Sequence, residues 1–449
     1  MEYTIKDAPF SWKQIRIVAV ASLGQLIGTG LATLVSVIIP LYQLISHPQL
    51  SSAMQGLVGA MDLLGIMVGS AILGKLSDKY GYLTLFRLCP LIILLSSVVA
   101  LIFPHISVLI VCLFLMGFGI GGEYSLDSDY ISELMPAKWT FTMVGAAKAA
   151  SALGNIIVAL VCFLMVKDWT DATAWPTLLW IMIALSGLML LTRIRFWQSP
   201  TWLISQGRIK EAEMVTKKFL GNDVTIDSPA ADSGDKTVTS KDGFFTFIGK
   251  HWKNVIFTGV PWACEGLGVY GIGVFLPILV MALGLEHAGL HETQIAHVAS
   301  SVEITLWISC IILPGFVIGL FLIPKMNGAK QQTWGFLLSG LSLLVLLFAY
   351  RNNWPHWISI GAFMCFELFL NIGPHLMTYV LPSKVFPVEV RGQGSGIAAS
   401  IGKLGAVLGV FFIPVLLKSG GSSLVLVVSI VVMLLGALVT YVFAPDHKL

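Results

Sequence analysis

The chain has 449 residues, of which 56% are hydrophobic and only 11% are charged. Soluble globular proteins carry about 25% charged residues, so this composition excludes that class and indicates a membrane protein embedded in a lipid bilayer. The formal net charge of +3 is small and gives no reason to expect a nucleic-acid partner.

Apolar stretches long enough to cross a bilayer recur along the whole chain. A spanning helix needs about 20 mainly apolar residues. Twelve stretches meet this requirement, so the sequence predicts an all-α membrane protein with twelve transmembrane helices. Their approximate ranges are 16–46, 53–75, 82–104, 106–134, 139–166, 174–196, 253–284, 294–323, 332–350, 355–382, 390–417 and 421–444.

Basic residues gather on one side of these predicted helices. Cytoplasmic loops carry an excess of lysine and arginine. With the N-terminus placed inside, the outer loops hold only Lys167, Arg351 and Lys418, while the inner segments include the basic group from Arg193 to Lys253. Both termini are therefore predicted to be cytoplasmic. The first apolar stretch is long enough to span and follows a polar start, which argues against a cleaved signal peptide.

Ionisable residues interrupt the apolar sequence of the fourth and fifth predicted helices. Glu123, Asp127 and Asp129 lie in the fourth helix and Lys148 lies in the fifth. A charged side chain at the centre of a spanning helix costs from about 2.5 to more than 10 kcal/mol, so such groups usually face water or each other. We interpret them as part of a transport site, except that Asp129 lies on a different face of the helix and is assigned to packing or to the gate. The alternative is that the acids are neutral and only hydrogen-bond between helices.

Other predicted helices contain single ionisable residues. Carboxyl groups occur at Asp62, Glu265, Glu303 and Glu367. Asp62 can line a cavity or make a polar packing contact, and the sequence does not choose between these two roles. A lone histidine such as His375 is interpreted as a packing or hydrogen-bonding group.

The turn after the second predicted helix carries an acid next to a base. Its sequence, GKLSDKYGY, runs from residue 74 to residue 82. It resembles the signature loop of the major facilitator superfamily, GxxxD[RK]xG[RK][RK], without the two trailing basic residues. In that family the loop forms ionic contacts that hold the transporter closed on one side, which implies gating roles for Asp78 and Lys79. The alternative is an ordinary charged turn.

The segment after the sixth predicted helix carries a longer motif. Its sequence, FWQSPTWLISQGRIKEAEMVTKKFL, begins at Phe196. It resembles the ESPRWLxxxGRxxEA motif that follows the sixth helix in sugar porters and in organic-ion and phosphate carriers, with Gln198 in place of the usual glutamate. On this resemblance the chain is identified as a member of the major facilitator superfamily. The segment is predicted to form a short amphipathic helix on the cytoplasmic surface.

The two halves of the chain repeat each other. The segment SELMPAKWTFTMVGAAKAASALG, from Ser132, aligns without gaps with SKVFPVEVRGQGSGIAASIGKLG, from Ser383. Major facilitator proteins consist of two pseudo-symmetric six-helix halves, with the site near the bilayer midplane. The resemblance therefore implies an N-terminal half at 1–196, a cytoplasmic linker at 197–252 and a C-terminal half at 253–449.

The repeat also relates individual residues of the two halves. In its register Lys403 lies one helical turn from the position equivalent to Lys148, so both lysines are expected to face one central space. The segment PSKVFPVEVRGQG resembles the family pattern PxExFPxxxRGxG, whose glutamate and arginine form a common pair. Here the first half keeps only the glutamate, Glu133, and the second half keeps only the arginine, Arg391. Both are assigned to the gate.

Within the superfamily the chain most resembles phosphate:proton and related metabolite carriers. GGEYSL, at 121–126, is similar to their GGDYPL, and ASIGKLGA, at 399–406, is similar to their ASGKxGA. The resemblance implies that Glu123 takes the place of their fourth-helix acid. It also implies that Tyr124 contacts the substrate and that Lys403 binds the anion.

The seventh and fifth predicted helices match these carriers only in part. Trp262 and Tyr270 fit two of their substrate-contacting positions. The family acid between those positions falls at Gly266, and this chain has Glu265 beside it. Ser151 replaces a fifth-helix glutamine, and the first-helix acids are absent. These departures leave the identity of the anion open.

The residues favour secondary active transport of a small anionic metabolite by alternating access, coupled to protons. Lys148 and Lys403 would supply the counter-charge for the anion, and Glu123, Asp127 and Glu265 would bind and release the proton. Because acids outnumber lysines, a carrier of organic cations or zwitterions is an alternative. A non-transporting nutrient sensor on the same fold is another, although the sequence lacks a large cytoplasmic signalling domain.

Other classes of protein have no support in the sequence. There is no nucleotide-binding loop, metal-ligand cluster or nucleophile–base motif, so we expect no enzyme activity, cofactor or bound metal. The chain also lacks the large first outer loop that is usual in animal organic-ion carriers. Together with the compact length this indicates a bacterial inner membrane, and we expect the protein to act as a monomer.

Overall fold

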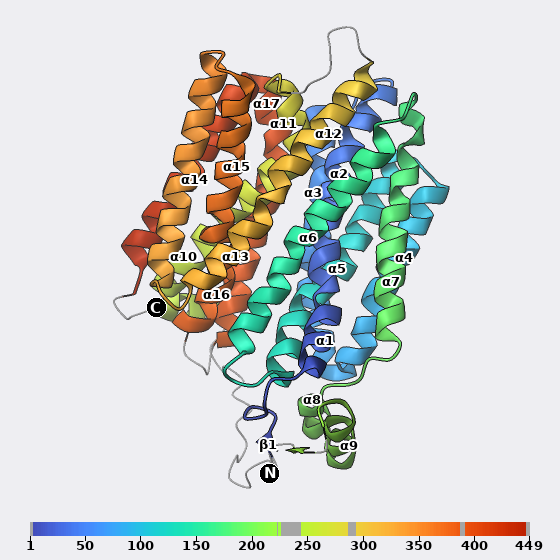
Figure 1. Ribbon diagram of the computed structural model, residues 1–449, viewed down its shortest axis with the longest axis vertical. Coiled ribbons are helices and arrows are strands. Elements are labelled where there is room, and N and C mark those ends of the chain that lie inside the picture. The colour runs from blue at the N-terminus through green and yellow to red at the C-terminus, as the bar shows by residue number, and fades with distance from the viewer. Residues whose placement is uncertain (1–2, 222, 226–243, 286–292, 387–390, 446–449) are drawn as a thin grey trace. The chain divides into compact units, whose positions relative to one another are not determined.

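The computed structural model describes residues 3–221, 223–225, 244–285, 293–386 and 391–445, which are almost entirely helical (Figure 1). The chain forms two compact units. Unit 1 comprises Met1–Thr29, Gly65–Gly154 and Leu179–Thr239, and unit 2 comprises Gly30–Leu64, Asn155–Leu178 and Ser240–Leu449. Three long helices contribute residues to both units, namely α2 (Leu23–Ile45), α3 (Ser52–Tyr80) and α6 (Thr140–Val166).

Unit 1 is a helical bundle with a small two-stranded sheet. The elements that lie wholly within it are β1 (Tyr3–Thr4), α1 (Trp12–Ala21), α4 (Tyr82–Ile102), α5 (Ile106–Leu134), α7 (Leu179–Arg193), α8 (Pro200–Ser205), α9 (Ile209–Phe219) and β2 (Val224–Thr225). Helix α4 packs against α5 and α7, and α1 packs against the same two helices. Strands β1 and β2 pair in parallel, so the N-terminal residues are joined to the linker.

Unit 2 is built around the long helical segment at the C-terminal end of the chain. Its remaining elements are η1 (Ala172–Leu178), α10 (Phe244–Gly266), η2 (Leu267–Ile272), α11 (Leu276–Ala282), α12 (Gln294–Cys310), α13 (Ile312–Leu322), α14 (Gly328–Arg351), α15 (His356–Ile372), α16 (Pro374–Val385) and α17 (Arg391–Phe443). Helix α17 packs along α10, η2 and α14, and α14 also packs against α15.

Eleven helical segments of the described chain are long and apolar enough to cross a membrane. The last of them, Gly394–Phe443, has 50 residues. It turns at Gly421, whose φ of 66° lies in the left-handed region that favours glycine. This segment therefore contains two of the predicted spans. Large apolar side chains such as Leu191 and Phe321 are exposed, as expected for helices that contact lipid. The predicted all-α membrane fold is confirmed.

Spanning segments of unit 2 pass from one helix into another, from α10 into η2, from α12 into α13 and from α15 into α16. Helix α10 continues into η2, which is a π-helix, and only then into α11. Helix α15 ends at Ile372 and is followed by the non-helical Gly373. Helix α16 begins at Pro374, which lacks the N–H that would continue the hydrogen-bond ladder. A π-turn holds one more residue than an α-turn and is frequent at functional sites. Each interruption changes the direction in which the following side chains point.

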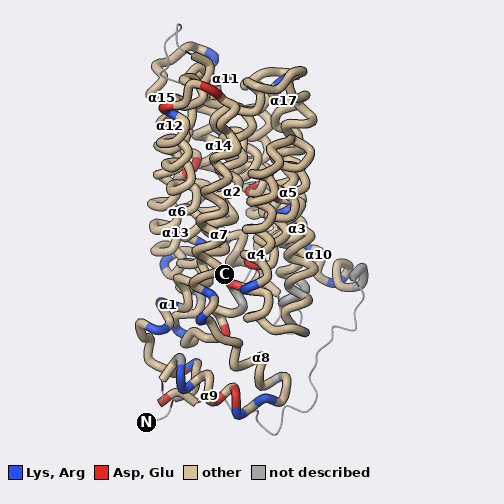
Figure 2. The backbone as a smooth tube through the Cα atoms, turned by 90° about the vertical axis from the view of Figure 1, so that its right-hand side faces the viewer, with Lys and Arg blue, Asp and Glu red and all other residues tan. Residues whose placement is uncertain are grey.

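The linker forms two short helices instead of the single helix predicted. Helix α8 begins after Ser199, whose hydroxyl accepts a hydrogen bond from the Trp202 amide at 3.2 Å. The Tyr130 hydroxyl donates to the Trp197 carbonyl at 3.0 Å, which joins the linker to α5. Figure 2 shows charged residues gathered mainly around α1 and α9 and sparse along the spanning helices.

Candidate functional site

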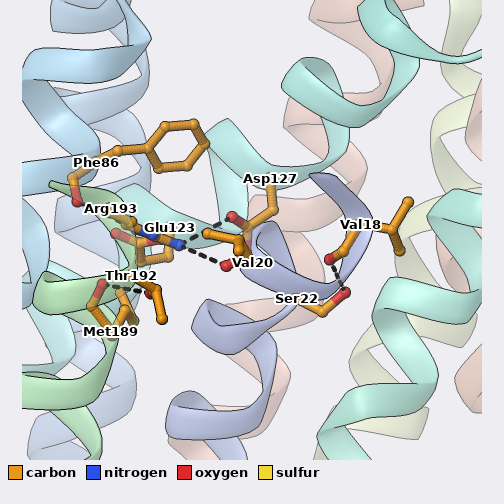
Figure 3. Close-up of polar contacts among 9 residues, drawn as sticks. All are labelled: Val18, Val20, Ser22, Phe86, Glu123, Asp127, Met189, Thr192 and Arg193. Atoms are coloured by element: carbon orange, nitrogen blue, oxygen red, sulfur yellow. Dashed lines mark hydrogen bonds and ion pairs between the residues drawn. The ribbon is translucent and has the colours of Figure 1, made fainter. Parts of the chain in front are cut away.

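The buried acids of α5 lie around one arginine. Arg193, the last residue of α7, places Nη1 2.5 Å from Glu123 Oε2 and Nη2 3.7 Å from Asp127 Oδ1 (Figure 3). The three side chains are at most 2% exposed. Because Glu123 and Asp127 are one helical turn apart, a single guanidinium reaches both. We call these three residues the arginine cluster.

Arg193 is held by more than the two acids. Nη1 donates to the Phe86 carbonyl at 3.3 Å, and Nη2 donates to the Val20 carbonyl at 3.4 Å (Figure 3). The guanidinium also lies 4.5 Å from the centre of the Phe86 ring. An arginine side chain stays charged in proteins. The cluster therefore has two carboxyl groups for one permanent cation, and its formal charge is −1 when both acids are ionised.

Helix α2 packs tightly against the arginine cluster. The Gln25 side chain is buried beside Asp127. A Cβ atom at Gly24 would lie 2.6 Å from Asp127 Oδ2 and equally close to Glu123 Cβ, so only glycine fits there. This close approach helps to keep water away from the ion pairs.

The sequence interpretation did not include Arg193 in the site. It assigned this residue to the cytoplasmic basic group, because Arg193 stands at the end of an apolar stretch and close to Arg195. The side of the membrane stays a prediction, but the fully buried side chain gives Arg193 a contact with the acids of α5 that this assignment did not include. The acids of α5 could have indicated such a partner in the sequence, because buried carboxylates need a buried cation.

The substrate-contact residues predicted in unit 1 lie close together on α5 and α6. Lys148 Nζ is 5.6 Å from the centre of the Tyr124 ring, and both side chains are half-buried. Ser151 is buried, and its carbonyl accepts a hydrogen bond from Thr29 Oγ1 at 2.6 Å. The backbone of Ser151 therefore ties α6 to α2 one turn from Lys148.

A second lysine–tyrosine pair lies in unit 2. Lys403 Nζ on α17 is 3.4 Å from the Tyr270 hydroxyl and 4.6 Å from the centre of its ring. Tyr270 belongs to the π-helix η2, so the pair is formed at an interrupted span. The Lys403 ammonium also interacts electrostatically with Glu265 and Asp62. We call Asp62, Glu265, Tyr270, His375 and Lys403 the lysine cluster.

His375 joins the lysine cluster through Glu265. Its Nδ1 lies 3.0 Å from Glu265 Oε1, and both side chains are buried. The Phe316 ring lies nearly perpendicular to the imidazole, with 5.1 Å between ring centres. The interpretation of His375 as a packing or hydrogen-bonding group did not anticipate a carboxylate partner. Only the fold brings the start of α16 next to α10.

Trp262 packs against the helix that carries Lys403. A Cβ atom at Gly402 would lie 2.6 Å from Trp262 Cγ, so α17 approaches the indole closely. The Tyr379 ring lies nearly perpendicular to the indole, with 6.4 Å between ring centres. Glu367 has a different partner, since Asn371 Nδ2 donates a hydrogen bond to Glu367 Oε2 at 3.2 Å.

The predicted gate is described only in part. Glu133 accepts hydrogen bonds from Ser199 Oγ and, at 3.1 Å, from the Tyr82 hydroxyl. It thereby ties the linker and α4 to α5. The side chains of Asp78, Lys79 and Arg391 lie outside the described residues.

Residues 11–449 match the model of the "Sugar (and other) transporter" family. The chain belongs to this family of membrane transporters. The prediction of a carrier and not an enzyme is therefore confirmed. The site residues predicted from the motifs remain predictions, as does the expectation that Lys148 in unit 1 and Lys403 in unit 2 face one space.

Individual relatives are similar along most of their length. "Inner membrane metabolite transport protein YgcS" of Escherichia coli K12 is 27% identical over 412 residues, which is 90% of this chain and 86% of that protein. "Inorganic phosphate transporter PHO84" of Saccharomyces cerevisiae is 23% identical over 450 residues, or 90% and 76% of the two chains.

Solved structures share the fold. The xylose transporter XylE from E. coli, in a partially occluded inward open conformation, superposes with a TM-score of 0.79 at 19% identity, covering 98% of this chain and 99% of that one. Another XylE structure is described as that of a major facilitator superfamily proton:xylose symporter. The predicted major facilitator fold with two halves is confirmed.

Proposed function

We propose that this protein is a secondary active transporter that carries a small anionic metabolite together with protons. The observation that carries the proposal is the contact between Lys403 and Tyr270 inside a span, where the ammonium is 3.4 Å from the phenol oxygen. An ammonium and a phenol can both donate hydrogen bonds to one anion. A cation is costly in a hydrocarbon bundle, and the residues that carry such charges usually bind substrate or ions.

The lysine–tyrosine pair in unit 1 supports the same substrate class. Lys148 and Tyr124 repeat the combination of an ammonium and an aromatic ring. We propose that both lysines contact the anion during the cycle and that Trp262 and Ser151 contribute to the same function. A metabolite substrate is also supported by the relatives, which include a metabolite transport protein and an inorganic phosphate transporter.

Proton coupling is supported by the surplus of carboxyl groups. The arginine cluster has two acids for one cation, so one proton would neutralise it. In the lysine cluster, Glu265 contacts His375, and histidine changes its charge near neutral pH. We propose that a carboxyl group that takes a proton weakens its hold on Lys403, which then binds the anion. Release of this proton on the opposite side of the membrane restores the attraction between the carboxylate and Lys403.

The excess of acids also favours a second candidate, a carrier of organic cations or zwitterions. In that case the carboxylates would bind the substrate and the lysine would repel it. The two candidates differ in which ligands stabilise the protein. We further propose a bacterial inner membrane, cytoplasmic termini and a monomer, in keeping with the inner-membrane relative from E. coli.

A ligand-stability screen tests the substrate class. Purified protein in detergent is heated with a panel of metabolite anions and a matched panel of organic cations. We expect an anion to raise the melting temperature of the wild type and of Lys418→Ala, an exposed lysine on the same helix. Lys403→Ala should lose that stabilisation. Stabilisation by cations alone, or anion binding that survives Lys403→Ala, would overturn the proposal.

Proteoliposomes test the coupling. The anion found in the screen should accumulate when the outside is made acidic, and a proton ionophore should abolish accumulation while exchange across the membrane continues. Accumulation that is insensitive to the ionophore would show that protons do not drive transport.

A further inference from the structure

Asp62 on α3 is a buried acid with an unsatisfied oxygen. Its side chain is 1% exposed. Oδ1 accepts a hydrogen bond from the Leu63 amide at 2.8 Å. Within the described part of the chain, Oδ2 has no hydrogen-bond partner. A buried polar atom without a partner costs free energy, so its persistence in a protein calls for a functional explanation.

Asp62 lies where α3 crosses α17 at close range. A Cβ atom at Gly59 would be 2.9 Å from Val410 Cγ1, so the two helices touch there. Asp62 follows Gly59 by three residues and Lys403 precedes Val410 by seven, which keeps each pair on one helix face. The carboxylate and the Lys403 ammonium accordingly interact electrostatically across this crossing.

The two carboxyl groups near Lys403 are not equivalent. Glu265 on α10 has His375 on α16 as a close partner, at 3.0 Å. Asp62 has the neighbouring backbone amide on one oxygen and an open position on the other. A proton added at Oδ2 would displace no hydrogen bond of the described chain, whereas a proton added to Glu265 must compete with the imidazole.

We propose that Asp62 is a proton-binding residue of the transport cycle, which attracts Lys403 when ionised and releases it to the substrate anion when protonated. Only the release of Lys403 to an anion rests on the proposed function; the binding of a proton by Asp62 does not. The step forms an O–H bond at Oδ2 with a proton from a hydronium ion of the aqueous phase, which becomes water, while Lys403 keeps its own proton. Among the described residues, the charged group that interacts with Asp62 is Lys403, which also interacts with Glu265, and Glu265 contacts His375. No motif resemblance assigns Asp62 a role.

Infrared spectroscopy of the full-length protein in liposomes tests the proton site without any substrate. Difference spectra between neutral and acidic buffer report the band of each carboxyl group that takes up a proton. We expect Asp62→Asn to lose one such band. Glu367→Gln, which changes another buried acid of unit 2, should keep it. Asp62→Glu covers the case in which Asp62→Asn does not fold, and should retain a titrating band at a changed frequency.

The link to Lys403 has its own readout. In Lys403→Met the band that depends on Asp62 should appear at higher pH, because a positive charge that favours the carboxylate is lost. Lys418→Met should leave it unchanged. A spectrum of Asp62→Asn identical to that of the wild type, or no displacement in Lys403→Met, would overturn the inference. These outcomes are independent of the anion screen, so failure of the substrate proposal remains distinguishable.

Discussion

Each of the two units places two carboxyl groups beside one cation, yet the two arrangements differ in how firmly that cation is held. In unit 1 Arg193 lies 2.5 Å from Glu123 and also donates to two backbone carbonyls. In unit 2 Lys403 is half-buried and contacts a tyrosine hydroxyl at 3.4 Å, with its acids attracting it electrostatically.

The chemistry of the two cations explains what this difference means. A guanidinium is planar, always charged and suited to fixed multidentate contacts, whereas an ammonium is a point charge on a flexible stem. The arginine cluster can therefore accept a proton and keep its geometry. The lysine cluster can exchange one partner for another. We infer that unit 1 holds its charges in place and that the substrate competes for the cation of unit 2.

The largest expected difference between the two units appears when each cation is removed in turn. Arg193→Met leaves two buried carboxylates without a counter-charge, and loss of one partner of a buried pair costs about 3–5 kcal/mol. We expect a correspondingly large loss of stability in denaturant unfolding of the purified protein. Lys403→Met should lose less, because Lys403 is partly exposed as a residue whereas the Arg193 side chain is fully buried. Equal losses in the two variants would contradict the distinction.

Removal of the Tyr270 hydroxyl tests whether the lysine cluster binds the anion. Tyr270→Phe keeps the ring under Lys403 but loses the phenol donor. A hydrogen bond to a charged group contributes about 1.5–3 kcal/mol, so the anion should bind roughly 10- to 100-fold more weakly in a thermal-shift titration. The control is Tyr441→Phe on α17, whose side chain is 77% exposed. Unchanged affinity in Tyr270→Phe would separate this tyrosine from the substrate.

The close packing of α2 on the arginine cluster gives a smaller test. In Gly24→Ala the new methyl group would press on Asp127 and Glu123, and such overpacking costs about 1–3 kcal/mol. Gly187→Ala on α7, where nothing lies within 4 Å of the added atom, should be neutral or slightly stabilising. If both variants unfold alike in denaturant, the fit around the cluster is looser than the geometry indicates.

The sequence was sufficient for the fold because hydrophobic length defines the spanning helices and because the linker motif resembles that of a known family. It was also sufficient to single out Glu123, Asp127 and Lys403, since charges in apolar stretches stand out. It could not supply their partners. Arg193 stands at the end of an apolar stretch, as a cytoplasmic loop residue would, and only tertiary packing places its side chain in the interior.

The pairing of Glu265 with His375 shows the same limit. The two residues are separated by more than a hundred positions, and a single polar residue in an apolar helix has no partner that can be read from its neighbours. The break at Gly373 and the packing of α16 on α10 bring the imidazole to the carboxylate. Neither feature has a periodic signal in the sequence.

The π-helix that carries Tyr270 has a consequence for how such a site can be altered. An α-helix advances about 100° per residue, so the additional residue of a wide turn rotates everything after it by about that angle. The aim of the phenol at the ammonium is thus set by chain length within Leu267–Ile272 as much as by side-chain identity. Deletion of a single residue there would redirect the aromatic group while leaving both members of the pair chemically intact.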